Sequence, residues 1–236
     1  MPTFLELRTA ILDISKNHYI QNDSDIQLAF RINNAITEIT GGLRLPNGQI
    51  SSPLPELFSF QIIETNISSA YIPLPDTYQR NVFLVIDENK DKIPPPKGGG
   101  YYSFGLFLNR INNQDLSETG DIYIACVKGT NLYYQGIPQS EKNITVFFYR
   151  KPVPMISDDD TPDGIPSHLQ IRLIKHYIGR QLSFEMVDGT ERMANYHNVE
   201  FWNAMRDLQD FIGETDATPV YYQSNGLDYT DGGICD

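Results

Sequence analysis

The fold is decided by residues 151–213, which read KPVPMISDDDTPDGIPSHLQIRLIKHYIGRQLSFEMVDGTERMANYHNVEFWNAMRDLQDFIG. An elbow rich in Asp and Pro leads to Ser167, which predicts the N-cap of a helix. From Leu169 on, apolar residues recur at helical spacing. Asp188–Glu191 resembles a capping box that begins a second amphipathic helix, and Gly213 is its expected C-cap. Two helices joined by a short turn pack antiparallel, so this segment predicts a helical hairpin whose apolar face needs a partner.

We expect that partner at the other end of the chain. Residues 4–18 place their apolar side chains on one side of a helix, and a second helical run begins at Asp25 and ends at Gly41-Gly42. The predicted fold is therefore α+β, with a four-helix layer built from both chain ends, an inserted β domain and an extended C-terminal docking tail. The expected boundaries are 1–42 and 153–213 for the helical domain, 43–152 for the β domain and 214–236 for the tail.

The middle of the chain is predicted to form an antiparallel β-sandwich or barrel. It begins with a stretch rich in Pro, Gly and Ser at 43–57, too irregular for a helix or strand. Short segments of alternating or continuous apolar residues follow, as is typical of strands. The expected strands are Phe58–Glu64, Ser69–Leu74, Arg80–Asp87, Tyr101–Leu108, Asp121–Lys128, Asn131–Gln135 and Asn143–Tyr149.

Composition limits the classes of partner. The formal net charge is −12, and Lys and Arg are not clustered, which argues against a protein that grips nucleic acid. The two cysteines do not make a disulfide framework; we expect reduced thiols, with Cys126 a small core residue and Cys235 near the end of the chain. The first residues do not match a signal peptide, and no apolar run approaches the about 18 residues of a membrane span. We expect a soluble protein with no membrane partner.

A search for chemical motifs predicts no catalytic residue, no metal and no cofactor. The run from Asp87 begins like an EF-hand loop, but Lys92 and Gly98 stand where the loop needs Gly and Glu. The acidic elbow at 158–163 is compatible with a cation, although negative charge before a helix N-terminus is favourable without one. The sequence has no G-x-S-x-G elbow and no P-loop, and its four histidines lack metal-ligand spacing.

Several stretches carry a family resemblance. They read VFFYRKPVPM at 146–155, DTPDGIPSHL at 160–169, NLYYQGIP at 131–138 and YIPLP at 71–75. Together with the two helices that follow, they resemble the adaptor, or head-to-tail connector, proteins of short-tailed bacteriophages. The resemblance covers most of residues 24–213.

The resemblance implies a virion structural protein and not an enzyme. Such adaptors form a homo-oligomeric ring, usually a dodecamer, at the portal vertex between capsid and tail. The ring binds the portal protein and gives downstream tail proteins (nozzle or tail fibre) a platform, while genomic DNA passes through its channel without sequence-specific binding. The protein would be made in the host cytoplasm. An acidic channel lining agrees with this role because it repels DNA phosphates.

Two sets of residues are candidate contacts with the portal or a neighbouring subunit. Trp202 lies beside the apolar stripe of the last helix, which suits an interface anchor, although a core position fits it equally well. The tail has no Lys or Arg, yet it carries large apolar side chains that are costly to leave in water. These side chains are Val220, Tyr221, Tyr222, Leu227, Tyr229 and Ile234.

An alternative function is a β-sandwich carbohydrate-binding module of a phage tail. Its basis is the tyrosine pairs Tyr101-Tyr102, Tyr133-Tyr134 and Tyr221-Tyr222, because aromatic faces stack on sugars. Tyrosine pairs on strands are also typical of cross-strand packing, so the sequence leaves both interpretations open.

Overall fold

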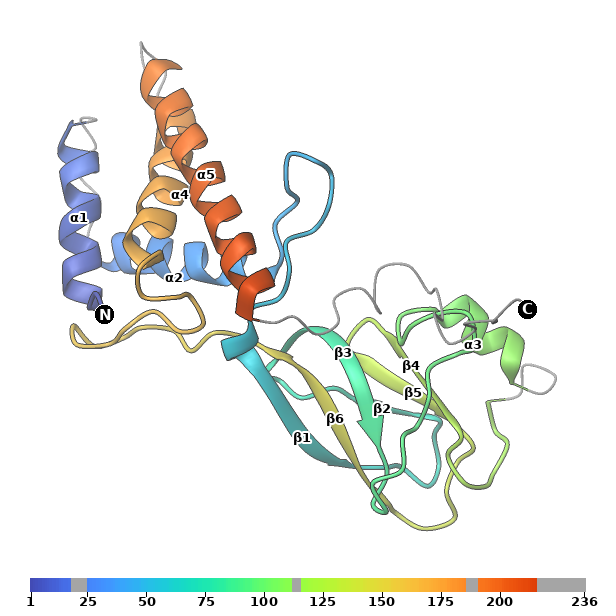
Figure 1. Cartoon of the computed structure of the whole chain (residues 1–236). Coiled ribbons are helices and arrows are strands. Elements are labelled where there is room, and N and C mark those ends of the chain that lie inside the picture. The colour runs from blue at the N-terminus through green and yellow to red at the C-terminus, as the bar shows by residue number, and fades with distance from the viewer. Residues whose placement is uncertain (18–24, 112–115, 186–190, 216–236) are drawn as a thin grey trace, which may run out of the picture. The chain divides into compact units, whose positions relative to one another are not determined.

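The computed structural model describes residues 1–17, 25–111, 116–185 and 191–215, and it confirms the α+β class. Within these ranges there are five α-helices and two three-stranded antiparallel sheets (Figure 1). The chain divides into two compact units. A helical unit comprises the chain up to Leu57 and again from Lys151 through the last helix, and a β unit comprises Phe58–Arg150.

The helical unit brings the two ends of the described chain together. Its helices are α1 (Phe4–Asn17), α2 (Asp25–Gly41), α4 (Gln170–Glu185) and α5 (Glu191–Thr215), and a 3-10 turn at Pro55–Leu57 ends its first part. Helix α4 packs against each of the other three helices, and α5 runs beside it in the opposite direction (Figure 1). Leu7, Ile32, Leu173 and Phe201, one from each helix, are fully buried, so the predicted helical hairpin does receive its apolar partner from the N-terminal helices.

Two predicted helix ends are wrong. Helix α4 begins at Gln170, because the residues from Ser167 to Leu169 form a turn in which the Leu169 N–H donates to the Pro166 carbonyl at 2.9 Å. Helix α5 continues through Gly213 to Thr215. Gly213 has no positive φ and an added Cβ would meet nothing within 4 Å, so this glycine does not adopt the left-handed conformation of a C-cap. The predicted capping box at residues 188–191 lies mostly outside the described residues.

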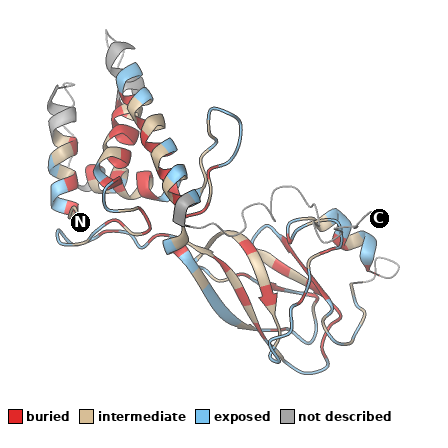
Figure 2. Cartoon of the chain, viewed as in Figure 1, coloured by how far each residue is buried: buried red, intermediate tan, exposed pale blue. Residues whose placement is uncertain are grey.

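The β unit contains β1 (Phe58–Glu64), β2 (Tyr71–Pro73), β3 (Tyr78–Ile86), β4 (Ile124–Lys128), β5 (Asn131–Gln135) and β6 (Asn143–Arg150). One sheet has the order β1-β6-β3 and the other β2-β5-β4. Strand β6 alternates buried residues Ile144, Val146 and Phe148 with more exposed ones (Figure 2), and both sheets contribute to one apolar core. Six of the seven expected strand segments are therefore confirmed.

The seventh expected strand, Tyr101–Leu108, is wrong. It is replaced by helix α3 (Phe104–Arg110). Phe104, Phe107, Leu108 and Ile111 recur at three and four residues, which is helical spacing, and Phe107 and Ile111 are buried against Ile124 and Cys126 of β4. The high β propensity of the aromatic residues hid this period. Cys126 itself is fully buried, as predicted.

Candidate functional site

The acidic elbow before α4 uses its carboxylates to hold its own backbone. One oxygen of Asp160 accepts hydrogen bonds from the N–H groups of Ile156 and Ser157, each at 2.7 Å, and these donors lower the pKa of Asp160. Asp163 accepts from the Val153 N–H at 2.8 Å, and Asp158 forms an ion pair with Arg8 of α1. Across the described residues, no group of three His, Cys, Asp or Glu side chains is placed to hold a metal ion. The elbow thus has a structural use for its negative charge.

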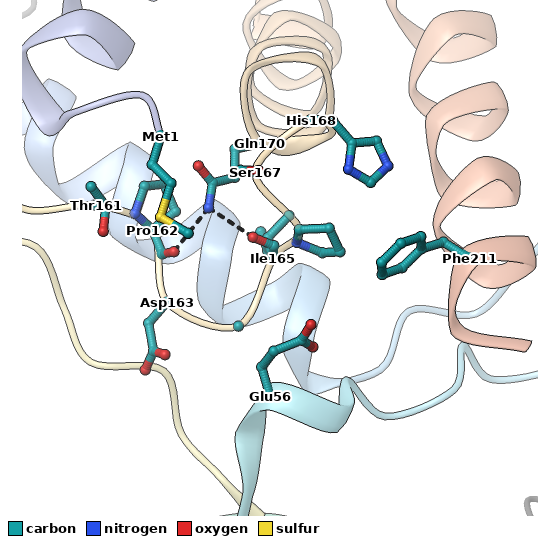
Figure 3. A pocket seen from close by; sticks show the side chains of 12 residues that line it. Met1, Glu56, Thr161, Pro162, Asp163, Ile165, Ser167, His168, Gln170 and Phe211 are labelled. Atoms are coloured by element: carbon teal, nitrogen blue, oxygen red, sulfur yellow. Dashed lines mark hydrogen bonds between the residues drawn. The ribbon is translucent and has the colours of Figure 1, made fainter. Parts of the chain in front are cut away.

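A cavity of about 510 Å³ opens between this elbow, Met1, the 3-10 turn and α5 (Figure 3). Gln170 lines this cavity, and its amide nitrogen donates to the carbonyls of Pro162 and Ile165 at 3.1 and 2.7 Å. The lining includes a serine, a histidine and an aspartate, but Figure 3 places His168 and Asp163 on opposite sides. Catalysis by a Ser-His-Asp triad requires the imidazole to bridge the other two groups, so this arrangement does not perform it.

Trp202 lies at the margin of the contact between α4 and α5. The guanidinium of Arg180 sits over three rings, with its carbon 4.8 Å from the centroid of Tyr177, 4.3 Å from that of Phe201 and 5.3 Å from that of Trp202. Phe201 is fully buried, whereas Trp202 is half-buried. The apolar surface continues on α5 through Tyr196 and Val199, which are 53% and 56% exposed. Trp202 is therefore both a packing partner inside the subunit and part of an exposed stripe.

A buried histidine pair joins α4 to α5. The Nδ1 atoms of His176 and His197 are 2.9 Å apart, so one ring donates and the other accepts. Burial lowers the pKa of His176; Lys175 and Arg172 act in the same direction, while Glu200 opposes them. Gly179 makes this approach possible, because a Cβ there would lie 2.6 Å from the His197 Nδ1.

Acidification should weaken the helical unit through this pair. The pKa of His176 is lower in the folded chain than its ordinary value of 6.5, so the unfolded chain binds the proton first. Stability is then fully present above pH 6.5 and is lost as the pH falls below that value toward the folded pKa. We expect the urea midpoint, followed by fluorescence of the single tryptophan in α5, to be lower at pH 5.5 than at pH 7.5. The control is His176→Asn, which keeps a polar atom near Nδ1 but does not titrate; an unchanged pH dependence in that variant would contradict the assignment.

Large apolar side chains also gather on the outer side of the β1-β6-β3 sheet. We call it the aromatic face and define it by Phe58, Phe60, Ile62, Phe83, Phe147 and Tyr149. Ring centroids on this face are separated by 5.5 Å for Phe58 and Phe83, 5.6 Å for Phe60 and Phe147, and 5.6 Å for Phe83 and Tyr149. Phe58, Phe60 and Ile62 are 48%, 59% and 61% exposed, and Figure 2 shows β1 as exposed along most of its length.

Sequence reasoning did not single out this face. The run FSFQIIE in β1 places Phe58, Phe60 and Ile62 on one side of the strand, so its alternation would assign these residues to the core, whereas the structure leaves them exposed. The missing signal is the pairing: Phe60 lies opposite Phe147 and Phe58 opposite Tyr149, while the neighbouring residues of β6 fill the core. A contiguous exposed patch of this kind marks an interaction surface in soluble proteins.

Three of the tyrosines that suggested a sugar-binding module, Tyr101, Tyr133 and Tyr134, pack within the β unit. The Tyr101 hydroxyl donates to the Ile93 carbonyl at 2.7 Å and accepts from the Val85 N–H at 3.2 Å, and burial raises the pKa of Tyr101 to about 12. Tyr134 is fully buried, and its hydroxyl accepts from the Asn66 N–H at 2.8 Å. Tyr133 packs against Tyr71 at 5.4 Å. These rings are used for cross-strand and loop packing, and Tyr221-Tyr222 lies outside the described residues.

The other predicted contact residues, Val220, Tyr221, Tyr222, Leu227, Tyr229 and Ile234, also lie outside the described residues. For the part of the chain that is described, no helix has the length and apolar character needed to cross a membrane. Comparison with protein families shows that the model of the SU10 adaptor protein family matches residues 2–223, which is nearly the whole chain and includes both units. Comparison with curated proteins returned no match.

Proposed function

Because the chain belongs to the SU10 adaptor protein family, we propose that it forms a ring that binds the portal and carries the tail of a short-tailed phage. Family membership gives it a structural role as a phage adaptor in the virion. The observation that carries the finer proposal is the extent of the match, residues 2–223, which spans the helical unit, the β unit and the first part of the tail. In the assembled virion the ring would lie at the portal vertex, and the chain would be made in the host cytoplasm.

The two units supply the separate surfaces that such a ring needs. A heterologous contact between ring neighbours uses two different patches of each subunit, and the portal and the tail need further ones. We propose that the four helices act as one layer and that the β unit, residues 58–150 instead of the 43–152 expected from the sequence, forms an inserted β-sandwich. The exposed stripe on α5 and the aromatic face support this division, since each unit carries its own exposed apolar surface.

Trp202 and the C-terminal tail are the proposed contacts. Trp202 shares the exposed side of α5 with Tyr196 and Val199, and a Trp at the edge of such a stripe is suited to anchor a neighbouring subunit. Because Glu214 and Thr215 belong to α5, residues 216–236 are proposed as a docking arm that binds the portal or a neighbouring subunit through its six large apolar side chains. The net charge of −12 supports a channel through which DNA passes without adhering.

The proposed role involves no catalysis and no cofactor. The described residues include a cavity of about 510 Å³, but its serine, histidine and aspartate are not arranged for acyl transfer (Figure 3). A structural adaptor needs only surfaces of the right shape and charge.

Co-sedimentation with portal rings tests the proposal. The full-length protein should pellet with portal rings of the same phage, and electron microscopy should show it as an added ring; free protein that stays in the supernatant would contradict the proposal. Trp202→Ala should weaken retention about tenfold, as expected for an interface aromatic. Trp202→Phe is the matched control, because it keeps an aromatic ring against Phe201 and Arg180. If the loss of retention in Trp202→Ala is accompanied by a comparable loss of stability, measured as a fall in Tm, Trp202 is a core residue and not a contact.

A further inference from the structure

The aromatic face includes large apolar side chains that the described residues leave about half exposed. Its inner counterparts Ile144, Val146 and Phe148 are buried, so the sheet is apolar on both sides. An antiparallel sheet with one solvated side normally carries polar residues there. Exposure of about half of each of three large side chains on β1 is costly in water, at roughly 25 cal/mol for each Å². A covering segment is therefore expected.

Strand β1 also presents a hydrogen-bonding edge. In the order β1-β6-β3, it pairs with β6 on one side and is the terminal strand on the other. It is seven residues long, with no Pro, so its free edge is a template for an additional strand. A peptide that adds to such an edge gains main-chain hydrogen bonds, and its alternate side chains lie over the neighbouring face of the sheet.

The sequence of this chain contains a segment of matching chemistry. Among the stretches outside the described residues, 216–236 is the one that carries several large apolar side chains. Its VYYQ at 220–223 differs by one residue from the LYYQ of β5 at 132–135, which forms a strand in this protein. Val220 and Tyr222 are two residues apart, as are Leu227 and Tyr229, so each pair would share one side of an extended strand. Asn225-Gly226 provides a turn between the pairs.

Charge and length also favour this segment. Residues 216–236 contain four Asp and no Lys or Arg. At one end of the aromatic face Arg80 lies opposite Tyr149, and Arg150 follows on β6, which gives that end of the sheet positive charge in an otherwise acidic chain. Twenty-one residues can extend to roughly 70 Å, whereas a seven-residue strand spans only about 23 Å. The segment is thus long enough to run along the whole of β1.

We propose that residues 216–236 bind the aromatic face by adding Val220–Gln223 to the free edge of β1, with apolar side chains covering Phe58, Phe60 and Ile62. This inference refines the proposed docking role of the tail, because it names an adaptor surface as the receptor. It does not require portal. The donor is the same copy or a neighbouring copy of the chain, and protein concentration separates these two cases.

Hydrogen–deuterium exchange of the full-length protein, without portal, tests this inference. Backbone amides of residues 220–223 should exchange at least about tenfold more slowly than an unstructured peptide of the same sequence. Phe60→Ser should abolish this protection while leaving Tm nearly unchanged, because the Phe60 side chain is 59% exposed. Ile62→Thr is a second variant that keeps strand propensity and removes apolar contact. Val199→Ser, at an equally exposed position on α5, should leave the protection intact.

Each result of these exchange measurements either supports or overturns the inference. Protection that is lost in Phe60→Ser and Ile62→Thr supports the inference; if it also falls on dilution, the donor is a neighbouring copy. Amides that exchange at the unstructured rate in the wild type overturn it, even if the two variants alter the oligomeric state. Protection that survives both variants also overturns it, since the segment then binds elsewhere. Because portal is absent, failure here leaves the portal co-sedimentation result unaffected.

Discussion

Replacing Phe148 by Ala is expected to lower the free energy of unfolding of the β unit by about 3–5 kcal/mol. Phe148 is fully buried on β6, where its ring meets Tyr78 of β3 edge-on at 5.8 Å and belongs to the core shared by both sheets. Removal of the ring leaves a cavity that the surrounding strands cannot close completely. For a unit of this size the loss corresponds to a fall in Tm of more than about 10 °C. Exchange of β6 amides reports the β unit directly.

The adjacent residue supplies the control. Phe147 is on the same strand but points to the aromatic face, where its ring is 5.6 Å from that of Phe60. Phe147→Ala removes the same group of atoms from a partly exposed position, so the expected cost is only about 1 kcal/mol. Equal losses in the two variants would show that the aromatic face is as well packed as the core.

The sequence predicts helices and strands well wherever period and boundary signals agree. Phe58–Glu64 and Asn131–Gln135 are strands with the expected bounds, and α2 begins at Asp25 as its polar cluster suggests. The failures occur where two signals compete. In α3, aromatic residues of high β propensity stand at helical spacing, and burial against β4 decides in favour of the helix. At Gly213, local propensity suggests a stop, but helix α5 continues because nothing in its surroundings requires one.

The interaction surfaces are harder to predict because they depend on which side of an element faces the core. The sequence does indicate the stripe on α5, since Trp202 falls beside a clear apolar period. The structure places Trp202 half-buried, which both an interface anchor and a core residue allow. The aromatic face is not predicted, because the alternation in β1 would assign Phe58, Phe60 and Ile62 to the core, and only the pairing with β6 shows that they lie on the outer side. The buried pair of His176 and His197 likewise depends on the approach of two helices, which no spacing within one helix reveals.

The elbow before α4 provides the second large effect. Gly164→Ala is expected to lower the free energy of unfolding of the helical unit by about 2–4 kcal/mol. Gly164 has a φ of +80°, which costs a residue with a Cβ about 1–2 kcal/mol. In addition, that Cβ would lie 2.7 Å from the Cγ and Cδ2 atoms of Leu57, which is almost fully buried, so the overlap adds a packing penalty. Urea unfolding followed by the fluorescence of Trp202 measures the loss, because this single tryptophan lies in α5.

Gly48→Ala separates the cost of the positive φ from the cost of the overlap with Leu57. Gly48 belongs to the same unit and has nearly the same φ, +83°, but an added Cβ there would meet nothing within 4 Å. The free energy of unfolding of this variant should therefore fall only by the cost of the positive φ, about 1–2 kcal/mol. The difference between the two variants measures how tightly the elbow packs against Leu57. If Gly164→Ala is no worse than Gly48→Ala, the elbow can shift away from Leu57 at little cost, and the cavity that it borders is adaptable instead of fixed by packing.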